Sequence, residues 1–290
     1  FIYKPCFAHP ISFFLFQFCI FQENFSMTQL NISFAGAGRV AEALCSEMFK
    51  AGHRIIDIVS PGEKNGRLLA SRFNAQWSDR LLFNDNCDLI IVAVPDNGLE
   101  AVLSEIICGE QSVIVHTAGS FGMDIFQLKH PRKGVLYPLQ TFTKGRDISL
   151  SGVPFFIEAA DEDTFNLLDN LVGSIGGESY AADTSNRKML HLAAVFACNF
   201  VNHNLTAARQ LAGVGGFGFS VLEPLIRETV NKALDNGPEY SQTGPAVRND
   251  TITISGHLQL LSSWPELKDM YTVTTESIIN HSKKTPDDKL

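Results

Sequence analysis

The chain has 290 residues, of which 45% are hydrophobic and 19% charged, and its formal net charge at pH 7 is −8. This length and apolar content suffice for one large or two ordinary domains with a buried core, which excludes a disordered chain. The acidic balance argues against a nucleic-acid surface, which needs clustered Lys and Arg, and it favours a small-molecule partner.

Six cysteines are scattered along the chain without a CxxC pair and without a histidine at metal-ligand spacing. Cysteine packs as a small hydrophobe when it is not a ligand or a disulfide partner. We therefore expect reduced thiols, no metal site and a cytoplasmic protein.

Residues 1–26 differ from the rest, because they hold eight of the 22 phenylalanines and only two charges, Lys4 and Glu23. Their apolar stretch, ISFFLFQFCIF, is shorter than the roughly 20 residues that span a bilayer, so we expect no membrane segment. A secretory signal is one interpretation, but no small-residue cleavage site follows. The other interpretation, which we favour, is an upstream or disordered appendage before a domain that begins at Met27.

The stretch NISFAGAGRVAEAL carries the first functional motif. An expected strand at 32–35 is followed by G-x-G-x-x-A and by an expected helix at 40–51, and a second strand at 54–59 completes a βαβ unit. In such a unit the glycines permit a tight turn and close approach of a pyrophosphate at the helix N-terminus. The pattern predicts dinucleotide binding by Gly36, Ala37, Gly38, Arg39 and Val40, and an ordinary glycine turn is the alternative.

The end of the second strand, IVSPGEKNGR, bears on which dinucleotide binds. NAD-binding domains place a carboxylate here for the ribose hydroxyls. No acid occupies this position, whereas Ser60, Lys64 and Arg67 could meet a 2′-phosphate. This composition favours NADP without excluding NAD, and the alternative is that both cations are merely solvated. A helix is expected at 66–73.

The next two strands end in polar turns. VAVPDNGL closes a strand at 89–94, and its Val94, Pro95 and Asp96 are expected beside the cofactor ribose, before a helix at 99–107. VHTAGSFG closes a strand at 113–116 in the same way. There we expect Thr117 to contact cofactor and His116 and Ser120 to contact substrate, with Gly119 and Gly122 allowing a ring to approach. The alternative for His116 is a strand-end histidine bonded to backbone.

Alternation of buried strands and helices, with further strands at 135–137 and 155–158 and a helix at 164–172, predicts an α/β fold with a doubly wound, mostly parallel Rossmann sheet. After Asp183 only helical patterns follow, at 186–211, 220–234, 250–261 and 265–281. The expected domains are therefore a dinucleotide-binding domain at 27–183 and an all-helical domain at 184–290. The glycine cluster at 213–219 predicts a hinge between helices.

One helix carries polar residues among apolar ones. At a constant 100° per residue, Lys188, His191, Asn199 and Asn202 fall within an arc of roughly 80°. Leaving such groups buried without partners costs about 1–3 kcal/mol each, so they must face water, a subunit or a ligand. We expect Lys188, His191 and Asn199 in catalysis and Asn202 in substrate orientation; a polar seam at an interface is the alternative.

These residues together resemble the superfamily of 6-phosphogluconate and β-hydroxyacid dehydrogenases. More closely, the chain resembles Rossmann-like NADP oxidoreductases with a helical C-terminal domain of unknown function. The strings that carry this resemblance are FAGAGRVAEAL, VAVPD, VHTAGS, YPLQTF, KMLHLAAVFACNF and TGPAVRND. Residues 1–26 have no place in the pattern, and Pro61 and Asn249 depart from it, where arginine and glycine are expected.

The resemblance implies a cofactor in the N-terminal domain, a substrate cleft between the domains and a homodimer built by the helical domain. It implies that Lys188 is the family's helix lysine, with Asn199 or Asn202 as its amide partner. It also implies substrate roles for Gln140, Thr141 and Arg248. The predicted function is hydride transfer between NADP(H) and a small carbonyl, imine or hydroxy acid; the alternative is a nucleotide sensor without turnover.

Overall fold

The computed structural model describes residues 28–126 and 130–282, and residues 1–26 lie outside this part of the chain. Two compact units divide it, one up to His191 and the other from Leu192 onward, and each is described by itself. This division falls inside the helix Thr184–Ala194, and the domain boundary expected at residue 183 stays a prediction. The division lies there because the first turns of this helix pack on the sheet.

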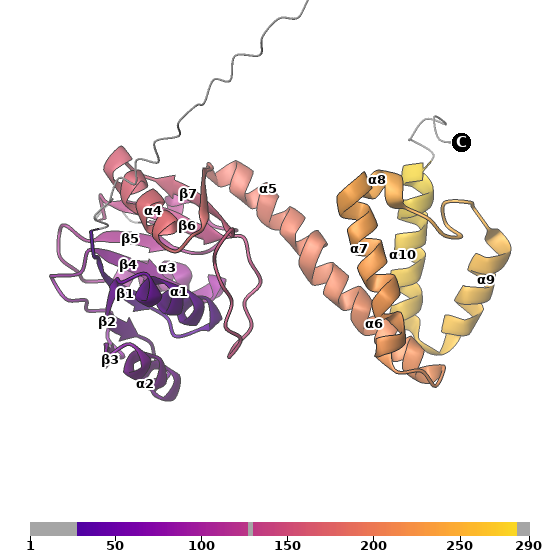
Figure 1. The fold of residues 1–290 in the computed structure, drawn as a ribbon, viewed down its shortest axis with the longest axis horizontal. Helices are drawn as coiled ribbons and strands as arrows, with labels where there is room; N and C mark the ends of the chain where they lie inside the picture. The colour runs from indigo at the N-terminus through magenta and orange to yellow at the C-terminus, as the bar shows by residue number, and fades with distance from the viewer. Residues whose placement is uncertain (1–27, 127–129, 283–290) are drawn as a thin grey trace, which may run out of the picture. The chain divides into compact units, whose positions relative to one another are not determined.

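The first unit is built on a mixed sheet of eight strands in the order β3-β2-β1-β4-β5-β6-β7-β8 (Figure 1). Neighbouring strands are parallel except β6 and β7, which pair antiparallel. The fold class predicted from the sequence is thereby confirmed. The strands are β1 Asn31–Ala35, β2 Arg54–Val59, β3 Gln76–Ser78, β4 Leu89–Val92, β5 Val113–His116, β6 Lys133–Pro138, β7 Pro154–Ala159 and β8 Glu178–Ala181.

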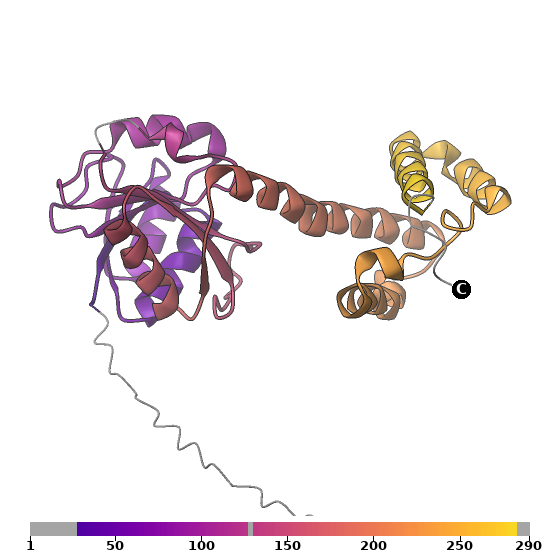
Figure 2. The same ribbon diagram turned by 90° about the horizontal axis from the view of Figure 1, so that it is seen from above.

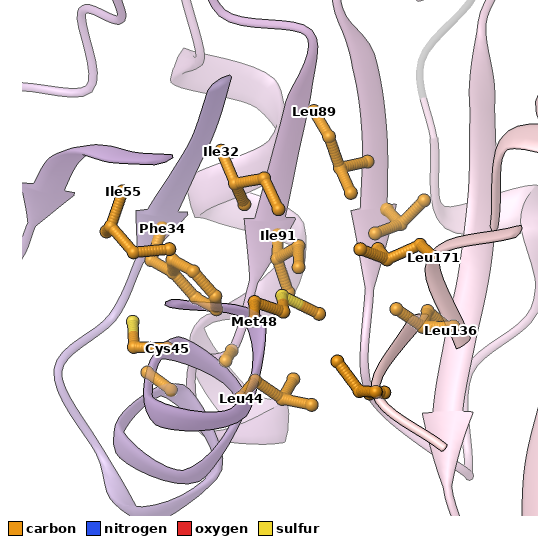
Figure 3. Close-up of a cluster of buried hydrophobic side chains, with 14 of the residues drawn as sticks. Ile32, Phe34, Leu44, Cys45, Met48, Ile55, Leu89, Ile91, Leu136 and Leu171 are labelled. Carbon is orange, nitrogen blue, oxygen red and sulfur yellow. The ribbon is translucent and has the colours of Figure 1, made fainter. Parts of the chain in front are cut away.

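Helices cover both faces of this sheet (Figure 2). The helices are α1 Arg39–Lys50, α2 Glu63–Arg72, α3 Leu99–Glu105 and α4 Glu162–Ser174, with short 3₁₀ segments η1 Asp96–Gly98 and η2 Met123–Ile125. Apolar side chains of α1, α2 and α4 share one core, and those of α3 belong to a second core on the other face. Figure 3 shows the first core, where Leu44 and Met48 of α1 lie against strand residues such as Ile91.

The six expected strands are all present. Strands β1, β4, β5 and β6 are apolar runs that are almost fully buried, whereas β2 and β7 are only partly buried. Two further strands, β3 and β8, were missed. Both are short and lie at the edges of the sheet, and their residues QWS and ESYA are partly exposed. An edge strand has one partner and little buried surface, so its sequence lacks the continuous apolar run that marks a central strand.

Chain order and spatial order diverge at the centre of the sheet, where β1 lies between β2 and β4. Connections from β1 run one way across the sheet and those from β4 run the other way. At such a switch point the loops after β1 and β4 separate and leave a crevice at the carboxyl edge, which is where open α/β sheets bind ligands.

Beyond the sheet the described chain is helical. Its elements are α5 Thr184–Ala194, a π-helical segment Val195–Phe200, α6 Val201–Val214, η4 Phe219–Leu222, α7 Glu223–Asn236, α8 Pro238–Ser241, α9 Thr251–Leu260, η5 Leu261–Ser263 and α10 Pro265–Ser282. The expected helix at 186–211 is thus interrupted by one π-helical segment, whose wider turns change the angle per residue. The glycine cluster at 213–219 does connect two helices, as expected.

The second unit has a very small interior. Of its residues in the range 192–282, those that are buried are Ala207, Ala246, Leu261 and Thr275. In the described ranges, 28–126 and 130–282, no helix combines the length and apolarity that a bilayer crossing demands.

Candidate functional site

The loop between β1 and α1 has the geometry of a phosphate-binding turn. Gly36 adopts a φ of +113°, and its N–H donates to Val59 O at 2.7 Å, which closes the turn. A Cβ on Gly36 would lie 2.3 Å from the carbonyl oxygen of Ala93 in the next loop. Only glycine fits here, because any side chain would meet both a left-handed backbone and a neighbouring main chain.

Gly38 has a different environment. It is the N-cap of α1 and has no side chain, so the first N–H groups of this helix receive no side-chain cap. A Cβ on Gly38 would have no atom within 4 Å. Open space beside unpaired N–H groups at the positive end of a helix dipole suits a pyrophosphate, and the other expected contacts, Ala37, Arg39 and Val40, lie in the same turn.

The turns after β4 and β5 meet at the same edge of the sheet. Ser120 Oγ donates to Asp96 Oδ2 at 2.5 Å, and the Thr117 N–H donates to Val92 O at 3.2 Å. These bonds join two segments in which the sequence predicted cofactor and substrate contacts. Pro95 and Asp96 are exposed, and Val94 and Thr117 are half-buried. Both turns therefore lie at the carboxyl edge of the sheet, and the first of them packs beside Gly36 through Ala93 and Val94.

His116 is fully buried at the end of β5. Its Nδ1 accepts from the Ala118 N–H at 3.2 Å, its Nε2 lies 3.4 Å from Gly122 O, and its ring stacks on Phe126. Burial lowers the pKa of His116 to about 4, so the ring is neutral. These contacts are those of the alternative, a strand-end histidine bonded to backbone, and they shape the 117–122 loop; the expected substrate contact stays a prediction.

A tyrosine and a histidine meet beside Gly119. The Tyr137 hydroxyl, at the end of β6, lies 3.0 Å from His191 Nδ1 on α5, and the two rings are in edge contact. A Cβ on Gly119 would lie 2.7 Å from His191 Nδ1 and 2.8 Å from Tyr137 Cζ. The space that the sequence predicted for an approaching ring at Gly119 is thus used by the protein's own rings.

Burial raises the pKa of Tyr137, so its phenol stays neutral at physiological pH. A neutral phenol can donate to His191 Nδ1, and the imidazole proton then resides on Nε2. This arrangement leaves an N–H group of a half-buried imidazole at the carboxyl edge of the sheet. The pair can hold a proton at His191 Nε2 and pass it on, which is the chemistry of a general acid.

Arg187 fixes α5 to the sheet. Its side chain is fully buried, its Nη1 donates to Glu158 Oε2 of β7 at 2.5 Å, and its Nη2 donates to Phe121 O at 2.6 Å. Thr184 adds a hydrogen bond to the same carboxylate at 2.9 Å. The charge of Arg187 is compensated by Glu158, so its role is to position α5 and the loop at Phe121.

The face of α5 that meets the sheet is therefore formed by Thr184, Arg187 and His191, which helical spacing places together. Lys188 is exposed and follows Arg187 by one residue, three residues before His191. Lys188 and His191 are neighbours on the helix surface, and the catalytic roles expected for them stay predictions.

Asn199, Asn202 and Arg248 are exposed and belong to the second unit. The arc calculated for the helix assumed a constant 100° per residue, and this assumption fails between Val195 and Phe200 because that segment is π-helical. The roles expected for these three residues stay predictions. Asn249 adopts a φ of +49°, which asparagine tolerates better than most residues and which accounts for glycine in the family pattern.

The end of β2 is organised around Trp77. The Ser60 hydroxyl is buried, accepts from Trp77 Nε1 at 3.3 Å and lies 3.5 Å from Gly62 O, so it is engaged below the surface. Arg67 lies over the Trp77 ring at 4.4 Å and pairs with Glu63 at 2.8 Å. Of the expected 2′-phosphate contacts, Lys64 and Arg67 are exposed.

The remaining expected substrate residues, Gln140 and Thr141, lie just beyond the end of β6 and are exposed. Gln140 Oε1 accepts from the Thr141 N–H at 2.7 Å, so this side chain folds back on its own turn. No group of three His, Cys, Asp or Glu side chains suited to a metal ion occurs in ranges 28–126 and 130–282.

Sequence reasoning did not include Tyr137 or Glu158 among the site residues. Tyr137 gives one usable signal, because it stands at the carboxyl end of a buried strand directly before Pro138. Glu158 gives no such signal, because an acidic residue near a strand end is common. Its partner, Arg187, is known only from the packing of α5 against the sheet.

Two families match the chain. Residues 31–119 match the family described as NADP oxidoreductase, coenzyme F420-dependent, and residues 153–278 match a domain of unknown function, DUF2520. No protein with curated annotation matches the sequence.

Solved structures extend the comparison. A protein of Bacteroides fragilis described as a "putative NADP oxidoreductase" is 35% identical with a TM-score of 0.81, over 88% of this chain and all of its own. The Thermotoga maritima protein TM1727 is 20% identical with a TM-score of 0.65, over 87% of this chain and 98% of its own. A reductive aminase of Aspergillus terreus, in complex with NADPH and ethyl-5-oxohexanoate, is 12% identical with a TM-score of 0.65, over 89% of this chain and 95% of its own. The last two likenesses concern the fold alone. The chain belongs to the family of proteins that join an NADP-oxidoreductase Rossmann domain to the C-terminal domain DUF2520.

Proposed function

We propose that this protein is an oxidoreductase that transfers hydride between NADP(H) and a small carbonyl, imine or hydroxy-acid substrate. The observation that carries the proposal is the juxtaposition, at one edge of the sheet, of a phosphate-binding turn at Gly36–Gly38 and the Tyr137–His191 pair. Bound NADPH would supply the hydride, and the side chains described here would supply binding, orientation and the proton.

The residues present fit a dinucleotide. Because Gly36 has no side chain, the turn can lie close to the Ala93 carbonyl. Gly38 leaves open space in front of the α1 N-terminus. Asp96 and Ser120 join the turns after β4 and β5, where a ribose would lie in a domain of this topology. In the described part of the chain, no atom lies within 4 Å of a Cβ built on Gly38, so no carboxylate is in direct contact with that position.

The Tyr137–His191 pair is suited to protonate a carbonyl or imine during reduction. The phenol holds the imidazole through Nδ1, and Nε2–H would donate to the substrate. As the Nε2 proton passes to the substrate, the phenol proton would move to Nδ1, and solvent would then reprotonate the phenolate of Tyr137. Arg187 and Glu158 hold α5 against the sheet so that His191 keeps this orientation. The Aspergillus terreus protein of the same fold binds NADPH with an oxo ester, which favours this substrate class.

Lys188 is the second group in this proposal. Its ammonium lies on the exposed surface of α5, three residues before His191, and could polarise a substrate oxygen or nitrogen from the side. Replacing Lys188 by Met is expected to lower turnover while cofactor affinity is retained. Equal loss of both would indicate that Lys188 serves cofactor binding instead.

Titration of the purified protein with NADPH and NADH, followed by calorimetry and nicotinamide fluorescence, tests the first step. Binding at micromolar concentration is expected, and no response at millimolar concentration would refute the proposal. Oxidation of NADPH in the presence of a panel of ketones, 2-oxo acids and cyclic imines tests the second step. Binding without turnover across the panel would favour the sensor that the sequence left as an alternative.

We also propose that the protein forms a homodimer through its helical unit. Within 192–282 large apolar side chains are exposed far more than a stable surface tolerates, for example Leu234 at 79%, Ile252 at 86% and Leu260 at 73%. A unit with four buried residues cannot offset its own ordering entropy, so a second copy would supply the missing burial. Light scattering coupled to size exclusion is expected to give twice the chain mass of 31.9 kDa, and a monomer at micromolar concentration would contradict this.

A further inference from the structure

At the end of β2, Ser60 is followed by Pro61 and Gly62, whose side chains offer a phosphate neither charge nor hydrogen-bond donor. The end of β2 also lacks a free carboxylate for ribose hydroxyls, because Glu63 pairs with Arg67 at 2.8 Å and Asp57 accepts from Ser33 Oγ at 2.9 Å inside the sheet. Recognition of the adenosine end must therefore involve other groups in the neighbourhood of α2.

One such group comes from far along the chain. The connection between β6 and β7, residues 139–153, crosses over α1, where Phe142 packs against the core and the Leu150 N–H lies 3.4 Å from Glu47 Oε2. From this connection Lys144 reaches α2, and its Nζ donates to Asn65 Oδ1 at 3.1 Å. Asn65 lies in the first turn of α2 and directly follows Lys64.

Lys144 also borders the phosphate-binding turn. A small cavity of about 30 Å³ is lined by Lys144, Asn65 and Ala37, and Ala37 is the residue between the two glycines of that turn. The acid that lines the same cavity, Glu42, is already ion-paired with Arg72 at 2.5 Å. Asn65 is a neutral amide, so it orients the ammonium group of Lys144 without compensating its charge.

We infer that Lys144 is a specificity-determining residue for the 2′-phosphate of NADP, acting with Lys64 at the α2 N-terminus. Two lysines then supply positive charge at the end of β2, and lysine binds phosphate as a point charge without a requirement for planar geometry. The inference rests on the proposed function, because it assigns one part of the cofactor to one residue. It adds a segment outside the βαβ unit to the adenosine site.

The experiment compares Lys144→Met with the wild type in calorimetric titrations against four ligands: NADPH, NADH, 2′,5′-ADP and 5′-AMP. Affinity for NADPH and 2′,5′-ADP is expected to fall about tenfold or more, because a charge contact to a phosphate is lost, while affinity for NADH and 5′-AMP stays within twofold. Lys144→Arg is expected to restore most of the NADPH affinity, since it keeps the charge.

Lys268→Met is the matched control, because it removes the same charge from an exposed helix position in the second unit. It is expected to leave all four affinities unchanged. Equal weakening of NADPH and NADH by Lys144→Met would overturn the inference, since it would mean that the connection only shapes the loop. Unchanged 2′,5′-ADP affinity would overturn it as well.

The two proposals fail in different ways. A wild-type protein that binds NADH and NADPH equally, with Lys144→Met unchanged, would overturn the role of Lys144 and leave the oxidoreductase intact. A wild-type protein that binds neither dinucleotide nor either fragment would overturn both.

Discussion

The hydroxyl of Tyr137 and the Nδ1 atom of His191 lie 3.0 Å apart, although 54 residues separate them in the chain. Gly119 makes this contact feasible, because any Cβ at that position would enter the space of both rings. The pair joins the last strand of the parallel part of the sheet to the helix that follows the Rossmann unit. Three segments from different parts of the chain thus converge on one potential proton donor.

Replacing His191 by Gln is expected to lower kcat for reduction about 10²-fold, because a general acid contributes roughly that much. Tyr137→Phe removes only the group that holds the imidazole, so a smaller loss of about tenfold is expected. Steady-state rates of NADPH oxidation with an active carbonyl or imine measure both. Tyr180→Phe is the control, since that hydroxyl contacts only Glu178 at the far edge of the sheet. Wild-type kcat in both site variants would refute a role for the pair.

The two glycines of the phosphate turn are expected to respond differently to alanine. Gly38→Ala meets no atom within 4 Å and has a φ of −86°, so the free energy of unfolding should change by less than about 0.5 kcal/mol. Its methyl group would occupy the space assigned to the pyrophosphate, and dinucleotide affinity should fall at least about tenfold. Gly36→Ala should destabilise the fold itself, because its Cβ would lie 2.3 Å from Ala93 O. Urea unfolding and calorimetry separate these effects, and full affinity in Gly38→Ala would argue against a phosphate there.

Removing one partner of the buried Arg187–Glu158 ion pair is expected to be costly. Glu158→Gln leaves the guanidinium of Arg187 buried without a countercharge, which typically costs about 3–5 kcal/mol. Urea unfolding monitored by fluorescence measures the loss. Arg227→Met breaks an exposed pair with Glu223 and should cost less than about 1 kcal/mol. Similar small losses in the two variants would mean that the buried pair does not hold α5 to the sheet.

Stability should fall as the solution is acidified, in part because of His116. Its pKa is about 4 in the folded protein and 6.5 in an unfolded chain. Between these values the unfolded chain binds a proton that the folded protein does not, so the free energy of unfolding decreases as pH falls from 6.5 to 4. The contribution of His116 is about 3 kcal/mol over this range. His116→Gln should show a shallower pH dependence, and an unchanged slope would contradict the buried neutral state.

Local sequence determined a large part of this protein. The G-x-G-x-x-A turn, from Gly36 to Ala41, could be predicted from adjacent residues alone, because a glycine with positive φ and a helix N-terminus are local features. The central strands could be predicted for the same kind of reason, since a strand buried on both faces is a continuous apolar run. Edge strands β3 and β8 and the π-helical segment Val195–Phe200 left no such local pattern.

Tertiary structure alone decided which side chains share the site. Tyr137 meets His191, Arg187 meets Glu158 and Lys144 meets Asn65 across separations of 54, 29 and 79 residues. These contacts depend on strand order, on the antiparallel return of β7 and on how α5 packs against the sheet. The chemistry of each residue is readable in the sequence, but partners far apart in the chain are selected by the burial and charge compensation of the whole fold, which no short window contains.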